Sequence, residues 1–227
     1  MKKIIFTSLA LLLLSCSSQK NSEEFMDATS GRYLFNANEV LEIYFEDEEM
    51  HAKWRGNDNI ELLKVSDSAF YMNELNEKML FVSKPEMHIE LAPKTEHKGV
   101  NYYFEKMKKG EKTPSEYFDD KEYKKALLAF KKIKEKDSLN PNISEYRLNK
   151  LGYTLLRSKK YNEARELFRI NIALYPKSSN VYDSMGDAFL EEKDTINAIE
   201  YYKKALAINP ENRSSKNRLN KLTKNKN

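Results

Sequence analysis

The sequence predicts an α+β protein in which a small antiparallel β-barrel or half-barrel is followed by an all-α helical repeat array. Three observations predict this class. Apolar and polar residues alternate with a period of two across residues 30–107, as in strands with one buried face. From residue 115 onward the apolar period becomes about 3.6, which is typical of amphipathic helices. Within residues 115–227 the chain repeats itself after 34 residues, which indicates stacked helical pairs.

The composition is that of an ordinary folded protein with a heavily solvated surface. The chain has 227 residues, of which 40% are apolar and 33% are charged. Its formal net charge of +4 comes from 39 basic and 35 acidic residues. Because this balance is mild, we expect no nucleic-acid partner.

The N-terminal stretch MKKIIFTSLALLLLSC predicts export. Two lysines precede an apolar run over Ile4–Leu14, which as a helix would span about 16 Å and is too short to cross a bilayer. The end of the run, Leu13–Cys16, reads LLSC and resembles the bacterial lipoprotein cleavage box. The resemblance implies that residues 1–15 are a signal peptide and that Cys16 carries fatty-acyl chains such as palmitate, which anchor the protein in a membrane. The alternative is an ordinary secretory signal with a chance cysteine.

Residues 16–29 are mostly polar and lack apolar periodicity. We therefore expect a flexible tether between the lipid and the first folded module. A lipid anchor implies a place in the bacterial cell envelope, at the outer membrane or the periplasmic face.

The short alternating runs of residues 30–107 predict an antiparallel meander. Trp54, Tyr71 and Tyr102 either line a small-ligand site at the mouth of the barrel or fill its core. Three histidines fall on separate segments without zinc-type spacing, so we expect isolated surface side chains, no metal site and no cofactor. They are His51, His88 and His97.

The helical module, residues 115–227, contains two copies of one unit, at about residues 145–178 and 179–212. Gly152 and Gly186 occupy the same position in the two copies. The coincident positions resemble the tetratricopeptide repeat consensus. A glycine inside a helix costs about 1 kcal/mol relative to alanine, and we predict that close packing of the first helix on the second requires it. The other coincident pairs are Ala164 and Ala198, Phe168 and Tyr202, and Pro176 and Pro210.

Partial units flank the two copies. Ala126 and Phe130 match the second helix of a degraded upstream repeat. The first helix of that repeat is expected to be mostly lost, because the position that corresponds to Gly152 is occupied by Pro114. Downstream, Ser214–Leu222 predicts a capping helix.

The tetratricopeptide resemblance implies a concave groove lined by five positions of each first helix, which binds an unknown protein or peptide. We expect Arg157 to face the carboxylates of the second copy and the partner to carry apolar and basic side chains. The alternative is a helical spacer or an oligomer contact. The groove positions are Tyr146, Asn149, Tyr153, Leu156 and Arg157 in the first copy, and Asn180, Asp183, Asp187, Leu190 and Glu191 in the second.

Together, the two modules resemble the accessory C-terminal region of β-lactamase-like serine hydrolases, a lipocalin-like β domain followed by tetratricopeptide repeats. The order of Gly31–Tyr33, Val40–Ile43, Lys53–Gly56, Ile60–Leu63 and Ser68–Phe70 carries the β part of this resemblance. The catalytic domain is missing, and the sequence contains no G-x-S-x-G, no H-E-x-x-H and no catalytic cysteine, so we expect no catalytic residue and no enzyme. The alternatives are a small-ligand-binding lipoprotein and an accessory subunit of a separate envelope hydrolase.

Overall fold

A computed structural model describes residues 20–224 of the chain, and its internal contacts divide the protein into two compact units. The first unit holds the strands and includes Leu41–Lys106 together with the residues up to Tyr33. The second unit holds the helical array and includes Leu34–Val40 and the chain from Met107 onward. The predicted signal peptide and Cys16 lie outside the described residues.

The strands form two antiparallel meanders, one of four strands in the order β1-β2-β3-β4 and one of five in the order β5-β6-β7-β8-β9. The α+β class and the antiparallel meander are thereby confirmed. The sheets are not closed, so the closed barrel, one of the two predicted forms, is not formed. The strands are β1 (Gly31–Asn36), β2 (Glu39–Glu46), β3 (Glu49–Trp54), β4 (Asn57–Glu61), β5 (Leu63–Ser66), β6 (Ala69–Met72), β7 (Glu77–Val82), β8 (His88–Leu91) and β9 (Tyr103–Glu105).

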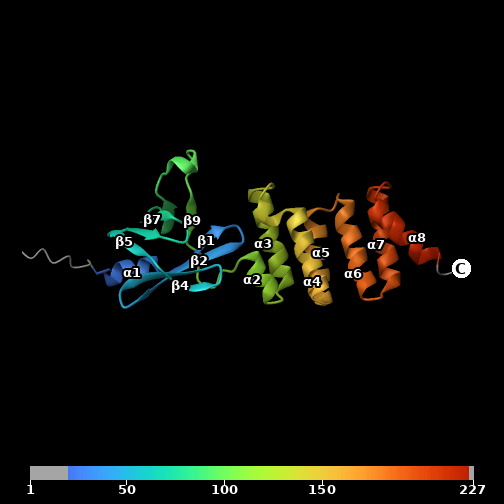
Figure 1. Cartoon of the computed structure of the whole chain (residues 1–227), viewed down its shortest axis with the longest axis horizontal. Helices are drawn as coiled ribbons and strands as arrows, with labels where there is room; N and C mark the ends of the chain where they lie inside the picture. Colours follow the sequence, from blue (N-terminus) through green and yellow to red (C-terminus); the bar gives the residue numbers. More distant parts are fainter. Residues whose placement is uncertain (1–19, 225–227) are drawn as a thin grey trace, which may run out of the picture. The chain divides into compact units, whose positions relative to one another are not determined.

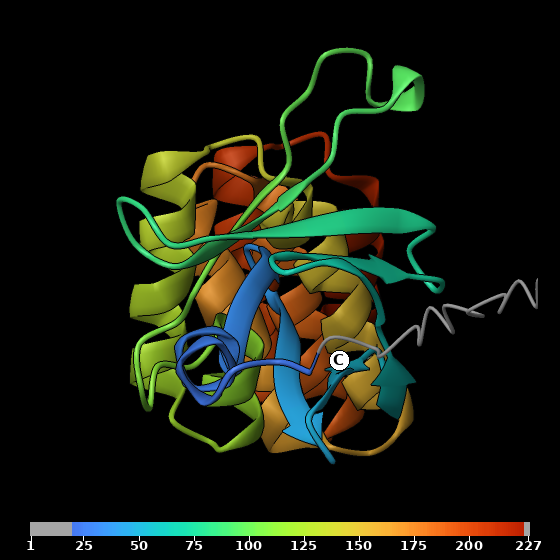
Figure 2. The ribbon, with the colours of Figure 1, turned by 90° about the vertical axis from the view of Figure 1, so that its left-hand side faces the viewer.

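Two-residue turns of one kind join β2 to β3 and β3 to β4. Asp47 and Glu48 have φ angles of 48° and 67°, and Arg55 and Gly56 have φ angles of 51° and 83°. Positive φ at both central residues is the type I′ geometry, whose twist matches that of the strands it connects. The segment between β8 and β9, which carries the short 3₁₀ helix η1 (Thr95–His97), instead extends away from the strands (Figure 2).

A helix stands where the sequence predicted part of a flexible tether. Helix α1 (Glu23–Thr29) is capped at its N-terminus by Ser22, whose hydroxyl accepts a hydrogen bond from the amide of Phe25. The Phe25 ring stacks on Phe70 at 5.9 Å and meets Phe81 edge-on at 6.1 Å. The tether prediction is therefore wrong for Glu23–Thr29, because the Phe25 ring and hydrogen bonds to the carbonyls of Ala28 and Thr29 hold the helix, and neither produces an apolar periodicity.

The three histidines are buried, with exposed fractions of 9% for His51, 3% for His88 and 9% for His97. The prediction of surface histidines is wrong because neighbouring strands and loops cover the polar phase of these segments. Among residues 20–224, no group of three or more His, Cys, Asp or Glu side chains is arranged to hold a metal ion. The covering groups are the rings of Tyr44 and Tyr103, at 5.4 and 4.4 Å from His51 and His88, and the carboxylate of Glu77, at 3.0 Å from His97.

The helices of the second unit lie side by side in chain order (Figure 1). Buried apolar side chains between consecutive helices form its core. The helices are α2 (Pro114–Asp119), α3 (Tyr123–Lys136), α4 (Glu145–Arg157), α5 (Tyr161–Leu174), α6 (Ser179–Glu191), α7 (Thr195–Ile208) and α8 (Arg213–Lys224), with the 3₁₀ helix η2 (Pro141–Ile143) before α4.

The same turn recurs after α2, α4 and α6. Lys121, Lys159 and Lys193 adopt left-handed φ angles of 61°, 59° and 63°. In each turn the lysine amide donates to the carbonyl three residues earlier, and the next amide donates to the carbonyl five residues earlier. Helices α2 and α3 therefore form a degraded repeat, in which α2 has 6 residues whereas α4 and α6 have 13 each.

Candidate functional site

Gly152 and Gly186 lie where an aromatic ring of the second helix of each repeat packs against the backbone of the first helix. A Cβ atom on Gly152 would lie 2.3 Å from Cε1 of Phe168, and one on Gly186 would lie 2.6 Å from Cε1 of Tyr202. Real Cβ atoms essentially never approach another heavy atom within 3.0 Å. The prediction that packing requires the glycines is confirmed.

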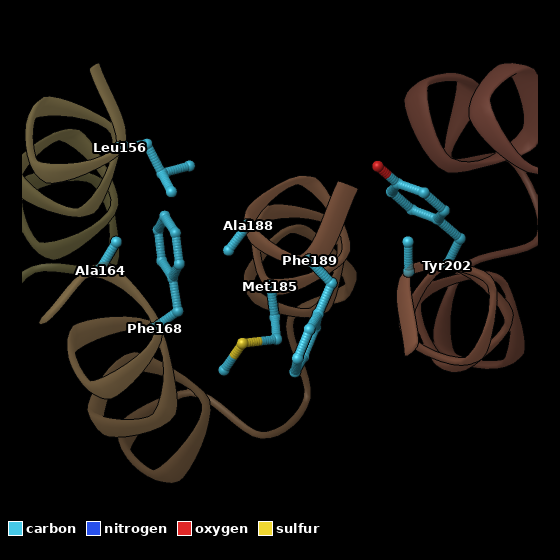
Figure 3. Close-up of a cluster of buried hydrophobic side chains, with 8 residues drawn as sticks. Leu156, Ala164, Phe168, Met185, Ala188, Phe189 and Tyr202 are labelled. Carbon is cyan, nitrogen blue, oxygen red and sulfur yellow. The ribbon is translucent and has the colours of Figure 1, made fainter. Parts of the chain in front are cut away.

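The buried aromatic rings also join one repeat to the next. In Figure 3 the Phe168 ring lies between Leu156 of α4 and the α6 side chains Met185 and Ala188. Phe168, Met185 and Ala188 are fully buried. Because α4, α5 and α6 share this core, the repeats form one continuous support for whatever surface they present.

One surface of the array is built by the first helices α4, α6 and α8, and we call it the first-helix face. At its centre the carboxylate of Asp187 accepts hydrogen bonds from Tyr153 of α4 at 2.9 Å and Tyr202 of α7 at 2.6 Å. The guanidinium of Arg218 on α8 lies 3.3 Å from the same carboxylate. Asp187 thus links four helices.

Burial raises the pKa values of three groups on this face, the phenols of Tyr153 and Tyr202 and the carboxyl of Asp183. Desolvation, followed by the nearby Asp187 charge, raises the pKa of Tyr153, and desolvation together with the Asp187 hydrogen bond raises the pKa of Tyr202. Both phenols therefore remain donors. Burial likewise raises the pKa of Asp183, although the hydroxyls of Ser215 and Ser214 on α8 donate to it and oppose the shift.

The structure corrects four predictions about the groove. Leu156, Asp183 and Asp187 have exposed fractions of 8%, 5% and 8%. They are buried because Leu156 belongs to the core and α8 covers the two carboxylates. Arg157 does not face those carboxylates: its guanidinium donates to Thr154, and Arg218 takes the predicted role.

The other predicted groove residues reach the surface to different degrees. Tyr146 is 76% exposed, and Asn180 and Glu191 are exposed as well. Tyr153, Leu190 and Asn149 are half-buried. The side-chain oxygen of Asn149 accepts no hydrogen bond from any residue that the structure describes. The first-helix face therefore keeps a polar and aromatic surface around a neutralised centre.

A cavity of about 320 Å³ opens on this face between α6 and α8, and we call it the α6–α8 pocket. Sequence reasoning missed it because the consensus defines groove positions only for the two full repeats. The five basic residues of Arg213–Lys224 are the signal that was available. Its lining residues are Leu190, Ser214, Asn217, Arg218, Lys221 and Leu222.

A second cavity, of about 560 Å³, is lined mainly by the second helices α5 and α7. Its basic side chains are already paired, Arg169 with Glu166 and Lys204 with Glu200. It therefore presents no free charge. Its lining comes from α5, α6 and α7: Arg169, Ile172, Tyr182, Tyr201, Lys204, Ala207 and Ile208.

In the β unit, the candidate ligand-binding aromatics do not line the described cavity. Trp54 is buried and its ring lies under the guanidinium of Arg55 at 4.2 Å, whereas Tyr71 donates to Asn76 and Tyr102 is 42% exposed. The cavity here, about 430 Å³, is lined by Lys20, Asn21, Ser22, Phe25, Lys64, Asp67 and Ser68.

A search of residues 20–224 for long apolar helices finds none that could span a bilayer.

Comparison with known proteins agrees with the geometry of the helical unit. Residues 179–212 match the tetratricopeptide repeat family. Over 92 residues the chain is 36% identical to the type IV pilus assembly protein PilF of Pseudomonas aeruginosa. This match covers 40% of the present chain and 32% of PilF. The chain thus spans about a third of the length of that relative.

The solved structures that match this chain cover about half of it. One is the second tetratricopeptide domain of human RPAP3, solved with the HSP70 peptide SGPTIEEVD, which is 18% identical to this chain. The match covers 48% of this chain and 88% of the RPAP3 domain, with a TM-score of 0.34. Another is MamA from Desulfovibrio magneticus, which is 23% identical; the match covers 50% of this chain and 62% of the MamA chain, with a TM-score of 0.33. The helix pairs, the spaced glycines and the family match together show that the helical unit contains tetratricopeptide repeats, of which residues 179–212 are one.

Proposed function

We propose that this chain is a non-catalytic lipoprotein of the bacterial cell envelope that binds a partner protein through the first-helix face. One observation carries the proposal. The first helices are fixed to one another through Asp187, while the Tyr146 side chain on the same helices stays 76% exposed. An exposed aromatic side chain on a rigid support is typical of a protein-binding surface, because it loses little conformational freedom on binding.

The anchor is proposed from the sequence. The basic start, the short apolar run and the LLSC box support cleavage before Cys16 and acylation of its thiol. A chain purified from the membrane fraction of its bacterial host should have a mass that lacks residues 1–15 and includes acyl groups on Cys16. An intact N-terminus or an unmodified Cys16 would contradict the anchor.

The partner is proposed to be a component of an envelope assembly. The relative with 36% identity carries the name of a pilus assembly protein, and its similarity to this chain extends over 92 residues. Binding without catalysis is the role we propose for the repeats here, with the β unit as an accessory module.

Photo-crosslinking from matched positions tests the binding face. Tyr146 on α4 and Ile196 on α7 are both 76% exposed, but only Tyr146 belongs to the first-helix face. With benzoylphenylalanine at position 146 of the full chain in cells, we expect one dominant crosslinked partner, and with the same residue at position 196 we expect that product to be absent. Equal crosslinking from the two positions, or none from position 146, would refute the proposal.

Two alternatives remain testable beside it, a small ligand in the β unit and an accessory role for a separate hydrolase. Mass spectrometry of an organic extract of the purified chain tests the first, and co-purification of a fluorophosphonate-labelled protein tests the second. Labelling of the chain itself would contradict its non-catalytic role.

A further inference from the structure

The α6–α8 pocket combines apolar walls with a basic rim. Leu190 of α6 and Leu222 of α8 supply the apolar lining, and Arg218 and Lys221 supply the charge. Its volume of about 320 Å³ is at the lower end of ligand pockets, which is room for one or two side chains of a peptide.

The charge on α8 is of one sign. Its sequence RSSKNRLNKLTK holds five basic residues and no acidic one. Arg218 is committed to Asp187, but Lys221 forms no ion pair with any residue between 20 and 224. Lys221 is therefore the cation at the pocket that is available to a partner.

The acidic side chains that the sequence placed on this face do not offset that charge. Asp187 is occupied by two phenols and Arg218, and Asp183 is buried beneath the hydroxyl of Ser215. Glu191 is exposed but is not among the residues that line the pocket. The lining of the pocket is consequently basic rather than acidic.

We propose that the α6–α8 pocket binds a partner segment that presents a carboxylate beside an apolar side chain. This inference rests on the proposed protein-binding function and reverses the charge that the sequence had led us to expect of the partner. The apolar side chain enters between Leu190 and Leu222, and the carboxylate pairs with Lys221. Asn217, which also lines the pocket, offers an amide for a further hydrogen bond.

Fluorescence anisotropy with synthetic peptides tests the charge. The full chain in detergent is titrated into fluorescein-labelled, C-terminally amidated 12-residue peptides of three kinds: alternating Leu and Glu pairs, alternating Leu and Lys pairs, and alternating Ser and Glu pairs. We expect the Leu/Glu peptide to bind at least ten-fold more tightly than the other two, and to weaken as salt is raised. Equal binding of the Leu/Lys peptide would overturn the proposal. A further gain from a free C-terminal carboxylate on the Leu/Glu peptide would assign the anion to a chain end, and no gain would assign it to a side chain.

Two lysines on α8 form a matched pair of variants. Lys221 lines the pocket, whereas Lys224, also exposed, does not. Lys221→Glu should weaken the Leu/Glu peptide about ten-fold, because it replaces an attraction by a repulsion, while Lys224→Glu should change it less than two-fold. Equal losses in the two variants would mean that only the general charge of α8 matters and would overturn the pocket.

The same variants separate this inference from the proposed function. If Lys221→Glu leaves the yield of the partner crosslinked from position 146 unchanged, the proposed binding face is supported and the proposed carboxylate pocket is refuted. If position 146 captures no partner at all, the proposed function itself falls.

Discussion

Gly152→Ala adds one methyl group at the most crowded point of the first repeat. On an exposed helix the same change would stabilise by about 1 kcal/mol, because alanine has the higher helix propensity. Here the added Cβ would meet three ring atoms of Phe168 at 2.3, 2.6 and 2.9 Å. The two effects have opposite signs, so the variant tests which one dominates.

The magnitude follows from how little Phe168 can move. Its ring is fully buried and packs against both the α4 and α6 side chains in the same core. Overpacking of a filled core costs about 1–3 kcal/mol, and three contacts under 3.0 Å place this site at the upper end. After the helix-propensity gain is subtracted, we expect a net loss of about 2 kcal/mol, or roughly 8 °C in melting temperature for a unit of this size.

Thermal melting followed by circular dichroism at 222 nm measures this loss, since most of that signal comes from the helical unit. Thr154→Ala, at an exposed position of the same helix, is the control and should change the melting temperature by less than about 2 °C. Adding Phe168→Leu to Gly152→Ala should restore part of the loss, because it removes ring atoms that clash. A melting temperature of Gly152→Ala equal to or above that of the wild type would refute the packing argument.

Three further predictions concern single side chains. Asp187→Ala leaves two phenols and a guanidinium without their acceptor and should lower the free energy of unfolding by about 3 kcal/mol in urea, whereas Glu191→Ala on the same helix should change it by less than about 0.5 kcal/mol. Phe25→Ala should destabilise the β unit by about 2 kcal/mol and expose α1 to limited proteolysis; an uncut α1 would contradict its dependence on this ring. Burial works against ionisation of Glu77, but hydrogen bonds from His97 and a lysine outweigh it and hold the pKa of Glu77 below its usual value of 4.5. The ion pair therefore stabilises above about pH 4.5 and is lost as the pH falls below it, so melting of the β unit between pH 5.5 and 3 should drop more in the wild type than in Glu77→Gln, and equal drops would contradict the linkage.

Much of the helical unit could be predicted because the residue types that recur in each repeat are those that pack its two helices together. A glycine and an aromatic residue recur with fixed spacing, and the structure brings Gly152 to Phe168 and Gly186 to Tyr202. Tyr153 and Asp187, which were both predicted as groove positions, are joined by a hydrogen bond, although the sequence did not predict this pair.

The burial of the groove could not be predicted in the same way. A consensus gives the side of a helix on which a residue lies, but not what the next helix places over it. Asp183 and Asp187 are on the expected side but are covered by side chains of α8, which the sequence predicts as a capping helix without indicating which groups it contacts.

In the β unit, alternation gave the strands but not the covering of their outer face. His51 lies on the polar phase of β3, yet its cross-strand partner on β2 is Tyr44, whose ring stacks on it. Cross-strand pairs depend on register, and register follows from turn geometry that a single alternating run does not contain.

The Asp187 carboxylate connects the two ends of the first-helix face, because Tyr153 of α4 and Arg218 of α8 both contact it. In stacked repeats each unit usually contacts only its immediate neighbours, but here α4 and α8, which are two repeat periods apart, share a single acceptor. Because the three partners of Asp187 share one acceptor, substitutions of Tyr153, Tyr202 and Arg218 are expected to be non-additive although the residues lie on different helices.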